Sequence, residues 1–333
     1  MLAMKVLVIG VGSIGERHVR CLQRTGRTEV AICEINGELR QAVAERYGLD
    51  EVYSQLDDAL QASFEAAVIC TPAQLHVEMA TRLADRKINL LIEKPLSTKL
   101  DGVAELVELV DRNGTLASVA YVYRAHPALA AMRQEVHSGR FGRPVQIVTQ
   151  GGQHFPTYRP AYREIYYTAR ATGGGAIQDA LTHVINSGQW LVGSIDCVAA
   201  DAAHQVLDGV QVEDTVHVIA RHGTVLGSYS LNQYQAPNEG TITVVCEAGT
   251  ARFESHQNRW RWMTEPGGQW HDEPAEKLER DELFLIQSNH FLDVLEAQAE
   301  PLCTLDAAVE TLRVNLAIIA AAERKQWVDP SSM

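Results

Sequence analysis

The chain has 333 residues, of which 46% are hydrophobic and 21% are charged, as in a soluble globular protein with a sizeable core. Its formal net charge of −13 argues against nucleic acid or an anionic membrane surface as a partner. No apolar run approaches the roughly 18 residues of a membrane span, and the N-terminus enters a strand pattern without the apolar region of a signal peptide. We therefore expect a cytoplasmic protein.

The cysteines are typical of the same compartment. They lie far apart, without a C-x-x-C pair or a spacing typical of metal sites, so no metal is expected. In a chain of this length they are predicted to be buried free thiols of a reducing compartment. They are Cys21, Cys33, Cys70, Cys197, Cys246 and Cys303.

The first 120 residues alternate short apolar segments with helical patterns. Nearly every residue of the apolar segments is hydrophobic, which is typical of strands buried on both faces of a parallel sheet. The alternation predicts an open, doubly wound α/β sheet of the Rossmann type in a domain over residues 1–122. The predicted strands are 5–10, 29–33, 66–70, 88–93 and 116–121.

From about residue 145 the pattern changes to polar–apolar alternation, in segments that follow one another without helices between them. This pattern predicts a largely antiparallel sheet in an α+β domain over residues 123–333, closed by two helices near 281–297 and 305–325. The predicted strands lie within 144–153, 214–223, 224–234, 241–249 and 250–256.

The segment VLVIGVGSIGERHV has the pattern G-x-G-x-x-G at Gly10, Gly12 and Gly15, directly after a predicted strand and at the start of a helix. In a dinucleotide-binding turn the first glycine makes the tight turn, the second admits the pyrophosphate, and the third lets helix and strand pack closely. Backbone N–H groups at the helix start, such as those of Ser13 and Ile14, then face the phosphates. A glycine turn without a ligand is the alternative.

Glu34 ends the second predicted strand, nineteen residues after Gly15. A carboxylate at this place is suited to accept hydrogen bonds from the adenine ribose, and it would repel a 2′-phosphate. Residues 35–37 contain no cation that could bind such a phosphate. NAD is therefore favoured over NADP as the cofactor, and a solvated surface glutamate is the alternative.

Two further segments carry groups suited to chemistry. Glu93-Lys94-Pro95 lies at the carboxyl end of the predicted strand 88–93, where open α/β sheets bind ligands, although a charged strand exit would look the same. In GGGAIQDALTH (173–183), Asp179 and His183 are spaced i and i+4, so on a helix they share one face. The preceding glycines lack a Cβ, so something can approach the backbone closely. A buried histidine on an ordinary helix is the alternative.

These segments, with ICTPAQLH (69–76) and YRAHPAL (123–129), resemble the Gfo/Idh/MocA oxidoreductases in order and spacing over nearly the whole chain. The resemblance implies an N-terminal Rossmann domain and a C-terminal domain with a large, open, mostly antiparallel sheet. It implies NAD as cofactor and interconversion of a secondary hydroxyl and a ketone on a sugar, sugar derivative or cyclitol. Relatives often assemble through the open sheet, so a homodimer or homotetramer is expected.

The resemblance also gives roles to single residues. His183 would be the base that takes the hydroxyl proton, a role that suits histidine because its ordinary pKa lies near neutral pH. Lys94 would hydrogen-bond the reacting oxygen, and Asp179 would hold the substrate or tune the histidine. The glycines would let substrate and nicotinamide lie against the start of the helix. Further implied contacts come from Thr71, Pro72, His76, Glu93 and Lys94 for the cofactor, and from Tyr123, Asp179 and His183 for the substrate.

Two positions depart from the family's pattern. Asn186 stands where the family commonly has an acidic residue, three after the histidine, so substrate contacts or local charge can differ. Ala125 ends a Tyr-Arg-Ala triplet where the family usually has a sequence such as RRF, which leaves the wall beside the nicotinamide undefined.

Residues 158–170 contain three arginines and four tyrosines. Arginine binds carboxylate or phosphate in bidentate fashion, and tyrosine stacks on sugar faces while donating hydrogen bonds. A similar stretch occurs in family members linked to surface-sugar metabolism, which suggests selection of an anionic or nucleotide-linked sugar. The alternatives are an exposed or interface loop, and pairing of Arg170 with a protein acid. The substrate-binding candidates are Arg159, Tyr162, Arg163 and Tyr166.

The main prediction is an NAD(H)-dependent dehydrogenase or reductase that acts on a CH–OH group. A redox-assisted glycosidase of the same family, in which transient oxidation permits elimination of the glycosidic group, is one alternative. A non-catalytic, NAD-sensing regulatory protein is another, because a fold does not fix a function. The joint presence of Lys94, Asp179 and His183 counts against the regulatory protein.

Overall fold

The computed structural model describes residues 3–273 and 278–333. Contacts within the chain divide it into two compact units: Met1–Ala125 with Glu279–Val309, and His126–Leu278 with Glu310–Met333. The sequence predicts a single boundary at 122/123. In the structure the chain returns to the first unit at Glu279, after residues 126–278 of the second unit. The returning segment does so because it carries an apolar helix and acidic side chains that complement the first unit.

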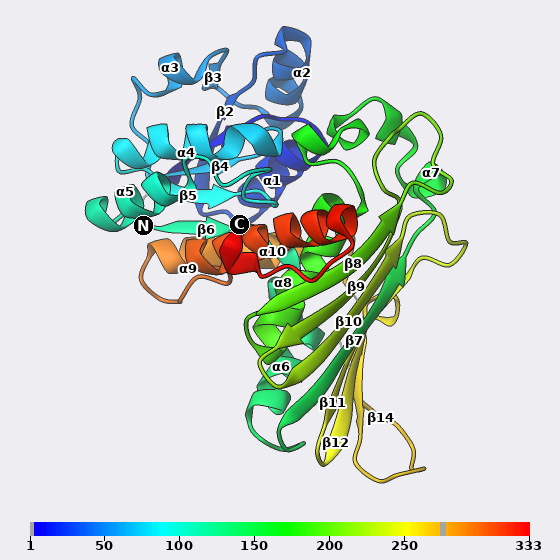
Figure 1. Cartoon of the computed structure of the whole chain (residues 1–333). Coiled ribbons are helices and arrows are strands. Elements are labelled where there is room, and N and C mark those ends of the chain that lie inside the picture. Colours follow the sequence, from blue (N-terminus) through cyan, green and yellow to red (C-terminus); the bar gives the residue numbers. More distant parts are fainter. Residues whose placement is uncertain (1–2, 274–277) are drawn as a thin grey trace. The chain divides into compact units, whose positions relative to one another are not determined.

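The first unit is built on a six-stranded sheet with the order β3-β2-β1-β4-β5-β6, in which every neighbouring pair is parallel (Figure 1). This is the doubly wound sheet that the alternation of elements predicts, with one short strand, β3, added at its edge. The strands are β1 Met4–Ile9, β2 Thr28–Cys33, β3 Val52–Tyr53, β4 Ala66–Ile69, β5 Asn89–Ile92 and β6 Ala117–Val119. The helices are α1 Ser13–Arg24, α2 Gly37–Tyr47, α3 Leu56–Ala59, α4 His76–Asp85, α5 Val103–Asn113 and α9 Glu282–Leu295.

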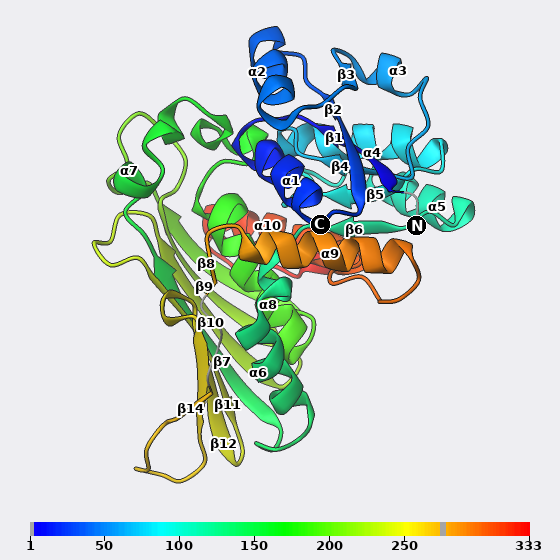
Figure 2. The ribbon, with the colours of Figure 1, turned by 180° about the vertical axis from the view of Figure 1, so that it is seen from behind.

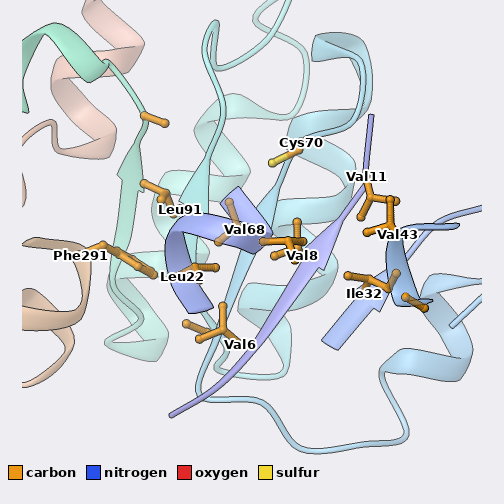
Figure 3. Close-up of a cluster of buried hydrophobic side chains, with 14 residues drawn as sticks. Val6, Val8, Val11, Leu22, Ile32, Val43, Val68, Cys70, Leu91 and Phe291 are labelled. Atoms are coloured by element: carbon orange, nitrogen blue, oxygen red, sulfur yellow. The ribbon is translucent and has the colours of Figure 1, made fainter. Parts of the chain in front are cut away.

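A buried apolar cluster joins the central strands of this sheet to helices from both ends of the sequence. Val8 of β1 and Val68 of β4 lie in it, with Leu22 of α1 and Phe291 of α9 (Figure 3). Basic side chains of α1 pair with Asp281 of the returning segment, since Arg20 Nη2 donates to Asp281 Oδ1 at 2.8 Å. Helix α9 is therefore part of the core of the first unit.

The second unit is built on an eight-stranded sheet with the order β14-β13-β12-β11-β7-β10-β9-β8, antiparallel except between β7 and β10. Strand β9 follows the expected alternation, because Val216 and Val218 are buried while His217 and Ile219 are exposed. The buried face lies under helices α6 and α8 (Figure 2). The strands are β7 Pro144–Gly152, β8 Cys197–Ala203, β9 Thr215–His222, β10 Val225–Asn232, β11 Glu239–Cys246, β12 Gly249–Glu254, β13 Arg259–Met263 and β14 His271–Glu273.

The helices of the second unit are α6 Pro127–His137, the short α7 Phe155–Tyr158, and α8 Thr182–Val192. The long helix α10, Leu305–Arg324, begins in the last residues of the first unit and continues into the second. The two sheets confirm the predicted fold class, an α/β doubly wound sheet followed by a mostly antiparallel sheet. In the described ranges, 3–273 and 278–333, no helix combines the length and the apolar character that crossing a membrane requires.

Candidate active site

The three glycines after β1 are needed for three different reasons. Gly10 has a φ of +80°, and a Cβ there would lie 3.1 Å from backbone atoms of Cys70. A Cβ on Gly15 would lie 1.8 Å from the carbonyl oxygen of Gly10, so α1 can approach β1 only without it. At Gly12, apart from the glycine and its chain neighbours, no heavy atom of the described residues lies within 4 Å of the place of a Cβ, and no described side chain caps α1. The turn thus fits a group that approaches Gly12 and the N–H groups at the start of α1, as a pyrophosphate does.

Glu34 follows β2 and holds its carboxylate beside this turn. Its Oε2 accepts a hydrogen bond from the N–H of Val11 at 2.9 Å, and its Oε1 accepts one from the N–H of Asn36 at 2.8 Å. A cation that sequence reasoning missed lies close by, because Nη1 of Arg40 donates to the carbonyl oxygen of Glu34 at 2.6 Å. The loop after β2 therefore carries both a carboxylate and a guanidinium. The signal for Arg40 was its place one turn into the helix that starts at Gly37.

His76 joins the loops that follow β4 and β5. Its ring nitrogens lie 2.8 Å from the carbonyl oxygen of Thr71 and 3.0 Å from that of Pro95, and the ring is buried. Burial lowers the pKa of His76 below its usual value. His76 thus holds the two loops together from inside the unit, and a cofactor would meet the loops themselves. Pro72, which precedes the turn into α4, is exposed.

Glu93 ends β5 and is paired with a histidine on α1. Its Oε1 lies 2.8 Å from Nε2 of His18, and its Oε2 accepts from the N–H of Lys94 at 3.1 Å. His18 is 0% exposed and Glu93 is 6% exposed. Burial alone would raise the pKa of Glu93, but the hydrogen bond and charge of His18, with the charge of Lys94, hold that pKa below its usual value. Sequence reasoning missed His18, although it lies one turn after Gly15 on the buried face of α1.

The glycines at 173–175 are explained by the protein's own groups. A Cβ on Gly174 would lie 2.2 Å from the carbonyl oxygen of Tyr167, and one on Gly175 would lie 2.4 Å from Oε1 of Glu213. Gly175 also has a φ of +94°, which favours glycine. The expectation that these glycines admit substrate and nicotinamide is therefore wrong for Gly174 and Gly175, because backbone and carboxylate atoms of the second unit fill that space.

Glu213 fixes the start of the helix that carries the predicted catalytic pair. Its carbonyl oxygen accepts from the N–H of Ala176 at 2.8 Å, and its Oε1 accepts from the N–H of Ile177 at 3.2 Å. Nη2 of Arg170 donates to its Oε2 at 3.0 Å. Glu213 is buried and satisfies helix-terminal N–H groups that would otherwise lack partners. No motif in the sequence pointed to it, since it lies thirty-six residues from Ile177.

The helix after the glycines opens with a π-helical turn, Ile177–Leu181, and continues as α8. Asp179 lies in the π turn and is 5% exposed, whereas His183 lies in the first turn of α8 and is half-buried. The sequence predicts a regular α-helix here, and the π turn widens the first turn by one residue. Single π turns inside helices occur frequently at functional sites.

Tyr166 contacts Asp179 directly. Its hydroxyl donates to Oδ1 of Asp179 at 2.6 Å, across thirteen residues of sequence. The tyrosine itself is 37% exposed. One of the predicted substrate-binding residues is thus linked to one of the predicted catalytic residues within the second unit.

The rest of the arginine–tyrosine segment, residues 158–170, divides into a buried and an exposed set. Tyr162 is 2% exposed and donates from its hydroxyl to the carbonyl oxygen of Asp208 at 2.8 Å, so its ring supports the segment from inside. Arg163 donates from Nε to the same carbonyl at 3.0 Å. Arg170 pairs with two acids, Glu213 and Glu323, as the alternative for it anticipated. Arg159 is exposed and makes no ion pair with any described residue.

The two positions that depart from the family pattern are both buried. Nδ2 of Asn186 donates to Oγ1 of Thr311 at 3.0 Å and so ties α8 to α10. Ala125 lies at the end of the first unit, two residues after the half-buried Tyr123. A short polar side chain at Asn186 therefore serves helix packing.

All six cysteines are free thiols, and five of them are buried while Cys197 is partly exposed. Within residues 3–273 and 278–333, His, Cys, Asp and Glu side chains do not gather in any group of three or more that could hold a metal ion.

The parallel sheet, the glycine turn and the carboxylate of Glu34 define the first unit as a dinucleotide-binding domain of the Rossmann type. The chain belongs to the Gfo/Idh/MocA oxidoreductase family. The model described as an oxidoreductase family with an NAD-binding Rossmann fold matches residues 4–121. The model of the GFO/IDH/MocA C-terminal domain matches residues 129–252. The predicted family is confirmed.

Similar proteins include an inositol 2-dehydrogenase of Ralstonia nicotianae, 28% identical over 208 residues, which are 61% of this chain and 58% of that protein. The chain spans about half the length of the curated relatives that it matches. Levoglucosan dehydrogenase in complex with NADH and levoglucosan has the same fold, with a TM-score of 0.88, 21% identity, and coverage of 98% of this chain and 99% of that one. The WlbA dehydrogenase from Bordetella pertussis, in complex with NADH and UDP-GlcNAcA, has a TM-score of 0.82, 25% identity and 98% coverage of each chain.

Proposed function

We propose that this protein is an NAD(H)-dependent oxidoreductase that interconverts a secondary hydroxyl and a ketone on a sugar, sugar derivative or cyclitol. The observation that carries the proposal is that the three glycines of the turn after β1 have different surroundings. Two of them are required by close packing, and the third leaves open space beside uncapped N–H groups. A turn selected only for packing has no need of that open place.

The residues that would hold NAD are those of the first unit's strand ends. The N–H groups of Ser13 and Ile14 would meet the pyrophosphate, and Glu34 would accept from the ribose hydroxyls. The loop from Thr71 to Pro72, held by His76, would border the nicotinamide half. NAD bound there would supply a hydride acceptor at the nicotinamide ring, or a donor in the reverse direction.

The chain's own residues would handle the proton and the reacting oxygen. His183 takes the proton of the secondary hydroxyl when the alcohol is oxidised and returns it when the ketone is reduced. Lys94 donates a hydrogen bond to the same oxygen while negative charge develops on it. Asp179 stabilises the protonated His183 or orients the substrate. Glu93 acts on Lys94 in two ways. Its Oε2 accepts a hydrogen bond from the backbone N–H of Lys94, and its negative charge attracts the charge of Lys94.

For the substrate, we propose an anionic or nucleotide-linked sugar, selected by the second unit. Arg159 supports this, because it is an exposed guanidinium without an ion pair to the described residues. Arg163 is also exposed, although it is steadied by Asp208. The protein would work in the cytoplasm as a homodimer or homotetramer, as its relatives' open sheets suggest.

The test is a panel of inositol, levoglucosan, UDP-GlcNAcA and UDP-GlcNAc, which lacks the sugar carboxylate of UDP-GlcNAcA, incubated with NAD while NADH absorbance is followed. Oxidation of UDP-GlcNAcA in strong preference to UDP-GlcNAc is the expected result, and Arg159→Ala should reduce that preference. Release of a free sugar without net NADH would instead establish the redox-assisted glycosidase. NAD binding without turnover of any compound would favour the regulatory protein.

A further inference from the structure

The contact between Tyr166 and Asp179 has the geometry of a strong hydrogen bond. At 2.6 Å, it lies in the range typical of an O–H group that donates to a carboxylate. Asp179 is buried in the π turn, where its carboxylate is removed from most solvent donors. A donor fixed on Oδ1 restricts rotation of the carboxylate.

Tyr166 itself is held firmly in place. Oγ1 of Thr172 donates to its backbone carbonyl oxygen at 2.6 Å. The next residue, Tyr167, is buried in an apolar cluster with Phe155, and its hydroxyl donates to Gln233. The carbonyl oxygen of Tyr167 packs against Gly174, just before the π turn. The tyrosine that reaches Asp179 is therefore anchored at its own carbonyl and at the residue that follows it, which fixes the position of the donor.

The arginine–tyrosine segment has further ties to the same helix. Nε2 of Gln178, the neighbour of Asp179, donates to the carbonyl oxygen of Arg170 at 3.0 Å. The guanidinium of Arg170 reaches the carboxylate of Glu213, which accepts from the first N–H group of the π turn. Hydrogen bonds thus connect the arginine–tyrosine segment to the helix, and Tyr166 is the residue of the segment that contacts the carboxylate of Asp179.

We propose that Tyr166 is a positioning residue for Asp179, and that the arginine–tyrosine segment takes part in the chemical step through this link. The inference rests on the proposed function, in which Asp179 serves the chemistry. The ring of Tyr166 is partly exposed on the segment that would select the substrate. A substrate bound to this segment would therefore change the surroundings of the tyrosine that orients Asp179. Loss of the hydroxyl should therefore lower turnover more than it weakens binding.

The first experiment compares Tyr166→Phe with Tyr53→Phe, using the compound of the panel that is turned over fastest. Tyr53 is a matched control because its hydroxyl donates to a carboxylate, that of Glu51, at 2.9 Å in the first unit. Tyr166→Phe should lower kcat by about 10-fold or more, with KM and NAD affinity nearly unchanged. Tyr53→Phe should leave kcat and KM unchanged.

The second experiment needs no substrate. Thermal midpoints of the wild type, Tyr166→Phe, Asp179→Asn and the double variant are measured at pH 7. Tyr166→Phe should lower the midpoint, and this decrease should be smaller in the Asp179→Asn background, where the charged partner of the hydroxyl is gone. A wild-type kcat in Tyr166→Phe, or the same midpoint shift in both backgrounds, would overturn the inference. A fully active Asp179→Asn would overturn the proposed role of Asp179 instead, whatever the thermal cycle shows.

Discussion

Nε2 of His18 and Oε1 of Glu93 lie 2.8 Å apart in the interior of the first unit, across seventy-five residues of sequence. His18 belongs to the helix that begins at the glycine turn, and Glu93 immediately precedes Lys94. The pair therefore connects the place where a dinucleotide would bind to the backbone of the residue proposed to act on the substrate's oxygen. Neither His18 nor Glu93 needs to contact the substrate to connect these two places.

The His18–Glu93 pair makes the stability of the protein depend on pH. Because the pKa of Glu93 is lowered in the folded state, the pair stabilises the fold above the carboxyl's unfolded pKa, and this contribution is lost as pH falls through the folded pKa. Glu93→Gln should cost about 1.5–3 kcal/mol at pH 7, as for loss of a hydrogen bond to a charged group. The cost should shrink on acidification. Thermal midpoints of both proteins from pH 7 down to pH 3 measure this, and a constant difference would contradict it.

Gly12→Ala and Gly15→Ala should change different properties: the first should weaken NAD binding, and the second should lower stability. Gly12→Ala adds a methyl group in open space, so the thermal midpoint should stay near that of the wild type while NAD affinity falls by about 10-fold or more. Gly15→Ala forces α1 away from β1, so it should lower the midpoint by itself. Calorimetric NAD titrations and thermal melts separate the two. Unchanged NAD affinity in Gly12→Ala would show that the open place is not the pyrophosphate site.

Gly175→Ala tests the packing of Glu213 against the start of the π turn. Gly114→Ala is its control, since Gly114 is in the left-handed region with a φ of +63°, and apart from its chain neighbours no heavy atom of the described residues lies within 4 Å of a new Cβ. Both variants place an alanine at a positive φ, which costs about 1–2 kcal/mol. Gly175→Ala should be less stable than Gly114→Ala because the carboxylate must also move. Equal free energies of unfolding, measured with urea, would contradict the assigned packing.

Glu34→Ser should be enough to move cofactor preference toward NADP, because Arg40 already supplies a cation in the same loop. Removing the carboxylate ends its repulsion of the 2′-phosphate, and the guanidinium can then pair with that phosphate. The control is Glu34→Ser combined with Arg40→Ala, in which the shift should disappear. Fluorescence titrations with NADH and NADPH give the ratio of dissociation constants. A wild-type protein that binds NADPH more tightly than NADH would refute the role of Glu34.

His183→Ala should lower kcat by about 10²–10⁴-fold, the usual effect of removing a general base. Lys94→Ala should lower it by about 10²–10³-fold, as for the loss of one donor to a developing oxyanion. Both variants should bind NAD normally because the turn from Gly10 to Gly15 is intact. Steady-state kinetics from pH 6 to about 10 should show partial recovery of His183→Ala at high pH, where hydroxide takes the proton. A near-normal kcat in either variant would remove that residue from the mechanism.

The sequence predicted what depends on local pattern and spacing. Buried parallel strands, alternating antiparallel strands and the roles of Gly10 and Gly15 all follow from periodicity or from a motif with its context. Features made by contacts between distant segments could not be predicted in the same way. The carboxylate of Glu213 against Gly175 depends on how the connection before β9 lies against a glycine turn, and nothing near either residue indicates the other.

The arginine–tyrosine segment shows the same limit on a smaller scale. Its composition indicated many polar contacts, but it did not indicate which side chains turn inward. Tyr162 fills the core while Tyr166, four residues later, reaches Asp179 and remains partly exposed. Short 3₁₀ turns connect these residues, so neither a period of 2 nor one of 3.6 sorts the buried from the exposed ones.

Helix α9, Glu282–Leu295, adds a constraint on how the protein is synthesised. The first 125 residues leave the ribosome long before this helix, yet Phe291 completes their core and Asp281 pairs with Arg20 on α1. While residues 126–278 are being translated, the nascent first unit therefore lacks Phe291 in its core and Asp281 beside Arg20. We expect this interval to favour chaperone binding, and we expect residues 1–125 to fold poorly as an isolated fragment.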